Sequence, residues 1–284
     1  MTARTVTRVI KAQPTSDGAG VRLFRTIGSQ ALDALDPFLL LDEFKSDQKN
    51  DYLAGFPDHP HRGFETVTYM LAGSMQHKDH KGNEGNLIAG SVQWMTAGRG
   101  IIHSEMPKQD NGLMWGFQLW VNLPAAQKMT APRYQDIPPE NVPELTTTEG
   151  VKIRVVAGKI DGVGGAVQGI VTDPLYLDVY VPRNTSCSLP VQNGHTAFCY
   201  VFVGQGQFGA TATAPGQQIA VQHLAVLSDG DELTVKTEDE AVRFLLLAGK
   251  PLREPIARYG PFVMNTREEI LKAFEDYQQG TLLG

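Results

Sequence analysis

The chain has 284 residues, of which 42% are hydrophobic and 20% are charged, and its formal net charge is −6. These values are typical of a soluble globular protein with one large or two ordinary domains, and the acidic balance gives no broad electrostatic reason to bind nucleic acid directly. Two cysteines are too few for a disulfide framework, and no apolar run resembles a signal peptide or approaches the ~20 residues of a membrane span, so we expect a cytoplasmic protein without membrane contacts.

Short runs rich in Val, Ile, Tyr, Phe and Leu recur along the chain between glycine and proline residues, of which there are 29 and 17. Runs of this kind predict β-strands, and strands without intervening helices favour a sandwich or a barrel. In chain order we expect strands at residues 66–71, 91–97, 113–123, 151–157, 175–181, 197–203 and 241–248.

The segment FPDHPHRGFET, residues 56–66, holds two histidines separated by one proline. The proline disfavours a helix, and in an extended strand residues i and i+2 point to the same side. His59 and His61 are therefore expected to share an inward face. Continued alternation would place Glu65 on that face too, and Gly63 would leave room beside an ion held there.

A second pair follows in TAGRGIIHSEMP, residues 96–107, where His103 and Glu105 are again two residues apart. The glycines before this pair permit a sharp bend or a bulge. About 40 residues separate His61 from His103, which is room for two or three strands, so the two pairs can lie on neighbouring strands of one barrel. Three imidazoles and one carboxylate would then converge.

These side chains predict a mononuclear metal site. Imidazole and carboxylate together suit Fe, Mn, Ni, Co, Cu or Zn, whereas the lack of a nearby cysteine disfavours a structural zinc site. Two histidines and a carboxylate with open positions are typical of non-haem Fe(II) oxygenases, and here a third histidine joins them. Four protein ligands on an octahedral ion leave two positions for water, substrate or dioxygen.

Other residues near these motifs are weaker candidates. His77 and His80 lie in MQHKDHKGNEG, which predicts a polar hairpin turn with solvated side chains. Arg99, just before the second pair, is the first choice for a cation in the cavity. The nearby large apolar side chains are expected in the core, with one or two of them lining the pocket; they are Trp94, Met95, Trp115, Phe117 and Trp120.

The proline-rich segment 123–145 has little strand pattern and predicts a linker between two β halves. The second half contains no pair of the His-x-His type, and His195 and His223 are isolated, so we expect a barrel without metal there. The clearest helix comes last, in NTREEILKAFEDYQQG. Thr266 stands three residues before Glu269 as in a capping box, and apolar residues follow at helical spacing. We expect a terminal amphipathic helix packed on the sheet.

At these motifs the sequence resembles the pirin family of the cupin superfamily. The resemblance runs from about residue 15 to the end and is carried by FPDHPHRGFETVTYMLAGSMQHKD, QWMTAGRGIIHSEMP and GPFVMNTREEI. It implies an all-β bicupin fold with two stacked antiparallel jelly-roll barrels and a C-terminal helix. The expected division is a metal-binding barrel at 1–130, a linker at 131–150 and a barrel without metal at 151–284 that ends in the helix.

The resemblance also implies a ligand set. The family's four ligands match His59, His61, His103 and Glu105 residue by residue, and the family holds iron. Fe(II) is therefore expected ahead of Mn, Ni, Co, Cu or Zn. Cupins in general take their carboxylate ligand from the first histidine segment (56–66), here Glu65, whereas pirins take it from the second (96–107). Glu65 is thus expected beside the ligands or in the cavity.

Bacterial pirins are associated with quercetin 2,3-dioxygenase activity. The resemblance implies a dioxygenase that opens the central ring of a flavonol such as quercetin and releases carbon monoxide. Glu105 is the expected catalytic proton acceptor, since a coordinated carboxylate keeps a spare lone pair next to the open site, and Glu65 is the second candidate. We expect a monomer. The alternative is a non-catalytic, redox-dependent regulatory protein with a protein partner, since animal pirins are associated with transcriptional co-regulation and some bacterial ones with partners in central metabolism. A third alternative is another cupin activity, such as an isomerase.

Overall fold

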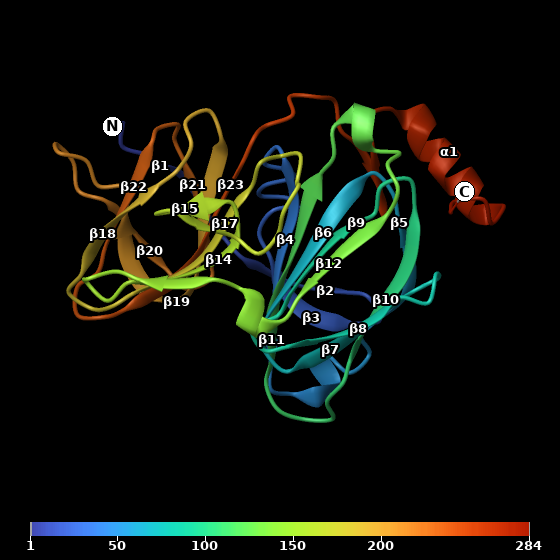
Figure 1. The fold of residues 1–284 in the computed structure, drawn as a ribbon, viewed down its shortest axis with the longest axis horizontal. Coiled ribbons are helices and arrows are strands. Elements are labelled where there is room, and N and C mark those ends of the chain that lie inside the picture. Colours follow the sequence, from blue (N-terminus) through green and yellow to red (C-terminus); the bar gives the residue numbers. More distant parts are fainter. Residues whose placement is uncertain (1, 284) are drawn as a thin grey trace. The chain divides into compact units, whose positions relative to one another are not determined.

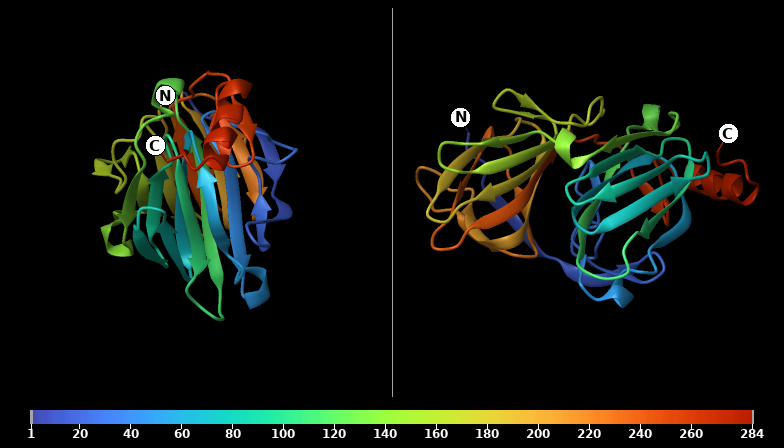
Figure 2. Two further views of the ribbon diagram at one scale, coloured as in Figure 1. Left: turned by 90° about the vertical axis from the view of Figure 1, so that its right-hand side faces the viewer. Right: turned by 60° about the horizontal axis from the view of Figure 1, so that its bottom comes forward.

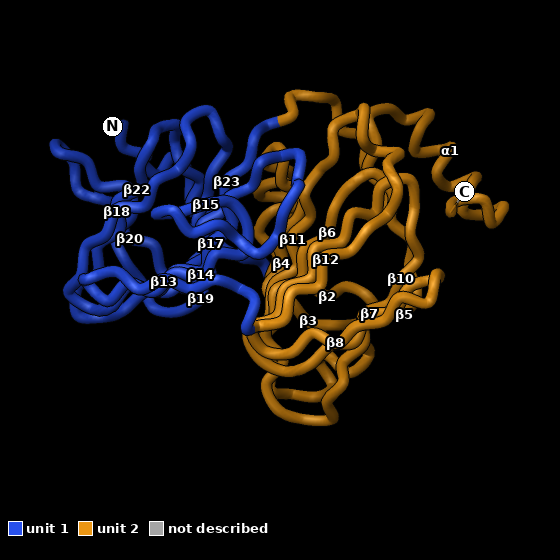
Figure 3. Tube along the Cα trace, in the orientation of Figure 1, with its two compact units in different colours: residues 1–13, 140–251 blue, residues 14–139, 252–284 orange. Residues whose placement is uncertain are grey.

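The computed structural model describes residues 2–283, and antiparallel β-sheets make up most of it, with an α-helix near the C-terminus (Figure 1; Figure 2). The chain forms two compact units (Figure 3). Unit 1 consists of residues 1–13 and 140–251, and unit 2 consists of residues 14–139 and 252–284. The expected all-β architecture with two barrel-type domains and a terminal helix is confirmed.

Unit 2 contains a seven-stranded sheet, in the order β12-β9-β6-β11-β4-β3-β2, and a four-stranded sheet, in the order β5-β10-β7-β8. Apolar side chains of both sheets pack together, since Met75 and Leu87 of the smaller sheet join Phe44 and Met70 of the larger one in a single core cluster. The two sheets therefore face each other across a shared interior. The strands are β2 (Gln13–Asp17), β3 (Val21–Arg25), β4 (Phe38–Ser46), β5 (Phe56–His61), β6 (Phe64–Ala72), β7 (Ser74–Asp79), β8 (Glu84–Ile88), β9 (Val92–Thr96), β10 (Ile101–Pro107), β11 (Met114–Asn122) and β12 (Arg133–Ile137), and short 3-10 helices lie at Lys49–Asp51, Ala125–Gln127 and Pro139–Asn141.

Unit 1 is built on a ten-stranded sheet whose main path runs β1-β21-β19-β23-β17-β14-β13. Its core consists of Val, Leu, Ile, Phe, Ala and Cys side chains from nearly every strand, and neither His195 nor His223 belongs to that cluster. The strands are β1 (Val6–Lys11), β13 (Glu144–Thr146), β14 (Lys152–Ala157), β15 (Lys159–Ile160), β16 (Val163–Gly164), β17 (Leu175–Val181), β18 (Ser186–Pro190), β19 (Thr196–Phe208), β20 (Gln217–Ala220), β21 (His223–Leu227), β22 (Glu232–Lys236) and β23 (Val242–Gly249).

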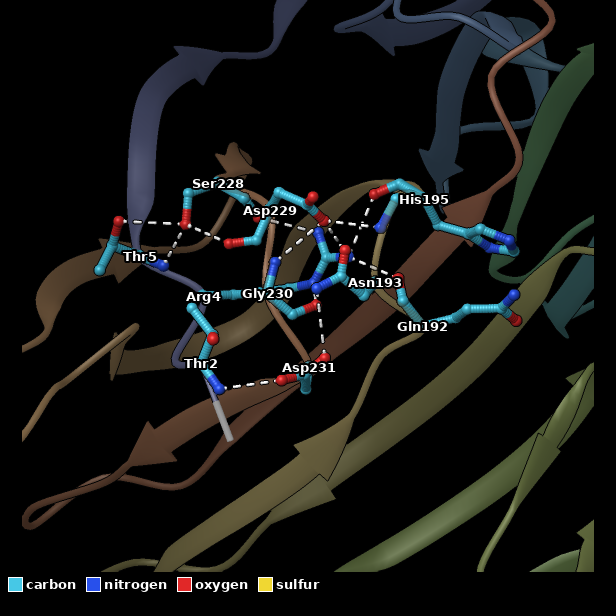
Figure 4. A network of polar contacts seen from close by, with 11 residues as sticks. Thr2, Arg4, Thr5, Gln192, Asn193, His195, Ser228, Asp229, Gly230 and Asp231 are labelled. Atoms are coloured by element: carbon cyan, nitrogen blue, oxygen red, sulfur yellow. Dashed lines mark hydrogen bonds and ion pairs between the residues drawn. The ribbon is translucent and has the colours of Figure 1, made fainter.

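Arg4 fixes the N-terminal segment to unit 1 (Figure 4). Its fully buried guanidinium donates hydrogen bonds to the carbonyl oxygens of Gln192, Ser228 and Gly230 at 2.7, 2.8 and 2.9 Å. Strand β1 follows directly and pairs with β21. The first residues of the chain thus complete a sheet whose other strands come from the second half of the sequence.

The helix α1 (Arg267–Gln278) begins as expected, because Thr266 Oγ1 accepts a hydrogen bond from the Glu269 amide while the Glu269 carboxylate accepts one from the Thr266 amide. Its buried face packs against the hairpin of β24 (Ala257–Tyr259) and β25 (Phe262–Met264). Among residues 2–283, no helix has the length and apolar composition needed to cross a membrane.

The units differ from the expected division at 1–130, 131–150 and 151–284. Residues 1–13 belong with the second half, and residues 252–284, including α1, belong with unit 2. Buried Arg62 explains why residues 252–284 belong to unit 2, since it donates hydrogen bonds to the Asp276 carboxylate at 2.8 Å and to the Leu282 carbonyl oxygen at 3.1 Å. The segment expected to be a linker contains β12 and β13, which pair with β9 in unit 2 and with β14 in unit 1.

Gly63 marks the point where the chain leaves β5 and enters β6. Its φ of 91° lies in the left-handed region, and a Cβ at this position would collide with the carbonyl oxygen of Val263 in β25. The expectation that this glycine leaves room for an ion is therefore wrong, because Val263 occupies the space.

Replacing Gly63 with alanine is expected to lower the free energy of unfolding by about 2–3 kcal/mol, since both the backbone conformation and the Val263 carbonyl oppose a Cβ. Urea unfolding measures this loss. Gly82→Ala is the matched control, because Gly82 has a φ of 84° but nothing within 4 Å of the added Cβ. Equal losses in the two variants would contradict the steric explanation.

Candidate metal centre

Strands β5 and β10 bring three histidines together. The two strands are antiparallel neighbours, with His103 opposite His59 and Ile101 opposite His61. One ring nitrogen from each histidine lies within 4.8 Å of those of the other two. The alternation expected for both His-containing segments thus places the three rings on one side of this small sheet.

Hydrogen bonds orient two of the rings. His59 Nδ1 lies 2.8 Å from the Pro57 carbonyl oxygen, and His61 Nδ1 lies 3.4 Å from that of Pro261. A carbonyl only accepts, so in both rings Nδ1 carries the proton and Nε2 keeps a lone pair. A backbone contact of this kind is how metal-binding histidines are commonly held in one tautomer.

His103 supplies the test of whether a metal fits. It is 1% exposed, and neither of its ring nitrogens has a hydrogen-bond partner among residues 2–283. A buried polar group without a partner is costly and needs an explanation. An ion shared with His59 and His61 would satisfy one of these two nitrogens, so the residues present fit a bound metal.

Burial also favours the neutral form of His61 and His103. Desolvation lowers the pKa of His61 well below its ordinary value, with a smaller effect of neighbouring His59 in the same direction. The pKa of His103 is lowered well below its ordinary value by burial and then by His61. A neutral imidazole retains the lone pair that a metal requires.

Glu105 lies beside this group but outside the set of mutually close ligand atoms. It is buried on β10, two residues after His103, and the pairing of β10 with β5 shifts register between these two positions. Thr68 Oγ1 lies 2.9 Å from Glu105 Oε1 and 2.7 Å from Gln118 Oε1. Because a hydroxyl has one proton, Thr68 serves one of the two oxygens at a time.

Glu65 does not continue the face of the histidines, and the expectation that it borders them is wrong. After Gly63 the chain enters β6, which belongs to the other sheet. Phe64 packs its ring 5.0 Å from that of His61, and Thr68 on the same face of β6 reaches Glu105. Glu65 points to the opposite face, where it accepts a hydrogen bond from Thr96 Oγ1 at 2.6 Å and where burial raises its pKa.

A cavity of about 670 Å³ opens beside the histidines, within unit 2. His59, His61 and Glu105 lie on one part of its wall, and apolar side chains including Leu40 and Trp120 form another. Pockets of this size and mixed lining typically hold one small aromatic molecule.

The other histidines and large apolar side chains named from the sequence lie only partly where they were expected. Trp94, Met95 and Phe117 are buried in the core, as expected, and Trp120 lines the cavity. His77 is not in a solvated turn, since it is 1% exposed on β7 with its Nε2 3.1 Å from Asp136 Oδ2. Trp115 is half-buried rather than fully in the core, and its ring N–H donates a hydrogen bond to Glu43. His80 is exposed and contacts the backbone of Ile102. In unit 1, His195 lies 3.8 Å from Asp173, and His223 contacts the Val221 carbonyl oxygen.

Arg99 is not among the residues that line this cavity; the cations there are Arg25 and Arg258. Arg258 lies in β24, about 150 residues after the histidine motifs, so local spacing could not indicate it. The signal nearest to it in the sequence is the GPFVMNTREEI motif, whose Gly260 and Pro261 also line the cavity.

Comparisons with known proteins agree with this architecture. The family models described as Pirin and as Pirin C-terminal cupin domain match residues 20–121 and 176–283. A Pseudomonas aeruginosa protein provisionally named a quercetin 2,3-dioxygenase is 51% identical over 286 residues, covering 98% of each chain, and human Pirin is 43% identical over 278 residues, covering 97% of this chain and 93% of its own. The crystal structure of a quercetin 2,3-dioxygenase from Acinetobacter baumannii has a TM-score of 0.89 at 34% identity, covering 99% of this chain and 98% of the other.

Similarity of this extent covers both units and both family domains, rather than the histidine motifs alone. The chain therefore belongs to the pirin family.

Proposed function

We propose that this protein is an Fe(II)-dependent dioxygenase that opens the central ring of flavonols such as quercetin, consuming one dioxygen for each carbon monoxide released. The observation that carries the proposal is the convergence of three imidazoles, two of them buried and one with both nitrogens unpartnered, beside a cavity large enough for an aromatic substrate. The names of the Pseudomonas and Acinetobacter relatives support the same reaction.

His59, His61 and His103 would hold the ion, with Glu105 as a fourth ligand from the same strand as His103. Imidazole and carboxylate together suit Fe(II), and also Mn, Ni, Co, Cu and Zn. When bound, the ion supplies Lewis-acid chemistry and a template for two reactants.

The cavity would orient the flavonol. Leu40 and Trp120 offer apolar and aromatic surface against which flat rings can pack, in the same cavity that His59 and His61 line. Enclosing the rings between such side chains also excludes water from the reacting carbon atoms.

Glu105 would accept the proton of the flavonol 3-hydroxyl. Its Oε1 is within reach of the Thr68 hydroxyl, so Thr68 can fix the orientation of the carboxylate and leave Oε2 for the substrate. A positioned carboxylate within hydrogen-bond distance of the hydroxyl is the geometric requirement for a general base.

The test is an oxygen-electrode assay of the Fe(II)-loaded protein with quercetin, with carbon monoxide quantified in the same vessel. We expect oxygen uptake and carbon monoxide release in equal amounts, and loss of both after the metal is removed with a chelator. Oxygen uptake no faster than that of the chelated protein would refute the dioxygenase, and turnover without carbon monoxide would point to a different cupin reaction.

A further inference from the structure

Arg258 brings a positive charge to the wall of the cavity, beside Trp120. Its guanidinium carbon lies 4.9 Å from the centre of the Trp120 ring, and its Nη1 donates a hydrogen bond to the Leu39 carbonyl oxygen at 2.9 Å. Within the described part of the chain, no carboxylate oxygen lies within 4.0 Å of this guanidinium. The contacts present leave most of its N–H donors free to bind a ligand.

Arg25, the other cation that lines the cavity, is already paired. Its Nε and Nη2 donate to both oxygens of Asp42 at 2.7 Å, and Nη2 also contacts Asp17 at 2.6 Å. Burial, followed by the nearby charge of Arg25, lowers the pKa of Arg258, while the more distant carboxylates of Asp33, Asp42 and Asp17 act in the opposite direction. Arg258 is therefore the guanidinium on the cavity wall that has no carboxylate in direct contact, whereas Arg25 is paired with two.

Trp120 connects the guanidinium with the proposed metal centre. Its ring centre lies 5.2 Å from that of His61, in an edge-to-face arrangement, while Arg258 stacks over it at 4.9 Å. A flat molecule held by its oxygens beside His61 and packed along Trp120 would therefore extend towards Arg258. The planar fork of a guanidinium matches the two oxygens of a carboxylate.

We propose that the natural substrate is a carboxylated aromatic compound, with its oxidised ring beside the three histidines and its carboxylate bound by Arg258. The proposal rests on the proposed function in that it names the ligand of the same cavity. Quercetin has no carboxylate at the corresponding end. It would then pack against the apolar side chains of the cavity without binding the Arg258 guanidinium.

The test compares two probes of the same shape, 3-hydroxyflavone-4′-carboxylate and 3-hydroxyflavone-4′-carboxamide, which differ by one charge. Their binding to the full-length Fe(II)-loaded protein is measured by titration calorimetry with oxygen excluded, so that neither probe is consumed. We expect the carboxylate to bind about 10-fold more tightly, as one charge-assisted contact supplies, and the preference to fall with added salt.

In Arg258→Met the preference should fall to less than about 2-fold while the carboxamide keeps its affinity, and Arg258→Lys should retain part of it. Arg22→Met is the matched control, because it removes the same charge from an exposed side chain that does not line the cavity. The wild-type preference should persist in that variant.

Equal affinities of the wild type for the two probes, a preference that survives in Arg258→Met, or no binding of either probe would each overturn the proposal. The outcome is separate from that of the oxygen assay. A carboxylate preference without oxygen uptake would refute the dioxygenase and keep the anion site, whereas quercetin turnover without the preference would do the reverse.

Discussion

Replacement of His103 by alanine is expected to lower the affinity for the metal by more than about 100-fold. Loss of a residue that only hydrogen-bonds to a ligand lowers it by about 10- to 100-fold. His103 is the imidazole with no hydrogen-bond partner on either nitrogen, so it has no contact in the described chain that could compete with a metal. Metal content after gel filtration without oxygen, followed by titration of the stripped protein, measures the loss.

The matched control is His80→Ala, which removes the same kind of side chain from an exposed position after β7. It should keep the wild-type metal content. Circular dichroism of both variants shows whether the fold is retained. A folded His103→Ala protein that binds metal as tightly as the wild type would remove His103 from the ligand set.

Replacement of Glu105 by glutamine is expected to lower flavonol turnover per bound metal by about 100- to 10,000-fold, the range associated with loss of a general base. The amide keeps the size of the side chain and can still contact Thr68, but it does not accept a proton. Initial rates of oxygen uptake, divided by the measured metal content, separate loss of the base from loss of the ion.

Glu65→Gln is the contrasting variant. Glu65 is as deeply buried as Glu105 but lies on the face of β6 that points away from Glu105, and glutamine keeps its size and the oxygen that accepts from Thr96. Turnover per bound metal should stay within a few-fold of the wild type. If Glu65→Gln lost as much activity as Glu105→Gln, the assignment of the base to Glu105 would be wrong.

The histidine cluster was predictable because it depends on short-range geometry. His59 and His61 lie within one strand, and the two-residue period of a strand determines that they share a face. Pro60 and the strand pattern around His103 were sufficient to place both segments in extended structure. The capping box at Thr266 was readable for the same reason, since it depends on residues three apart.

The errors arise where distant segments decide the outcome. Alternation predicted Glu65 on the inner face, but Gly63 sends the chain into the other sheet because Val263, 200 residues away, fills the space beside it. His77 looked solvated in a polar segment, but Asp136 and Tyr134 of β12 cover it. Neither partner could be identified from local sequence.

The predicted boundaries differ from the observed units for the same physical reason. Strand β1 pairs with β21 more than 200 residues later, and Arg62 pairs with Asp276 in α1. Contacts of such long sequence separation leave no periodic signal in the chain. Arg258 reaches the cavity because residues 252–284 belong to unit 2, whereas the local sequence indicates Arg99 as the cation.

Anomalous X-ray diffraction from crystals grown with Fe(II) without oxygen, recorded on both sides of the iron absorption edge, tests the metal centre most directly. We predict one anomalous peak about 2.0–2.2 Å from the Nε2 atoms of His59 and His61 and from one ring nitrogen of His103, as expected for metal–imidazole bonds. Density beyond the peak on the cavity side should show solvent in the open positions. A peak elsewhere, or none between the three rings, would contradict the account.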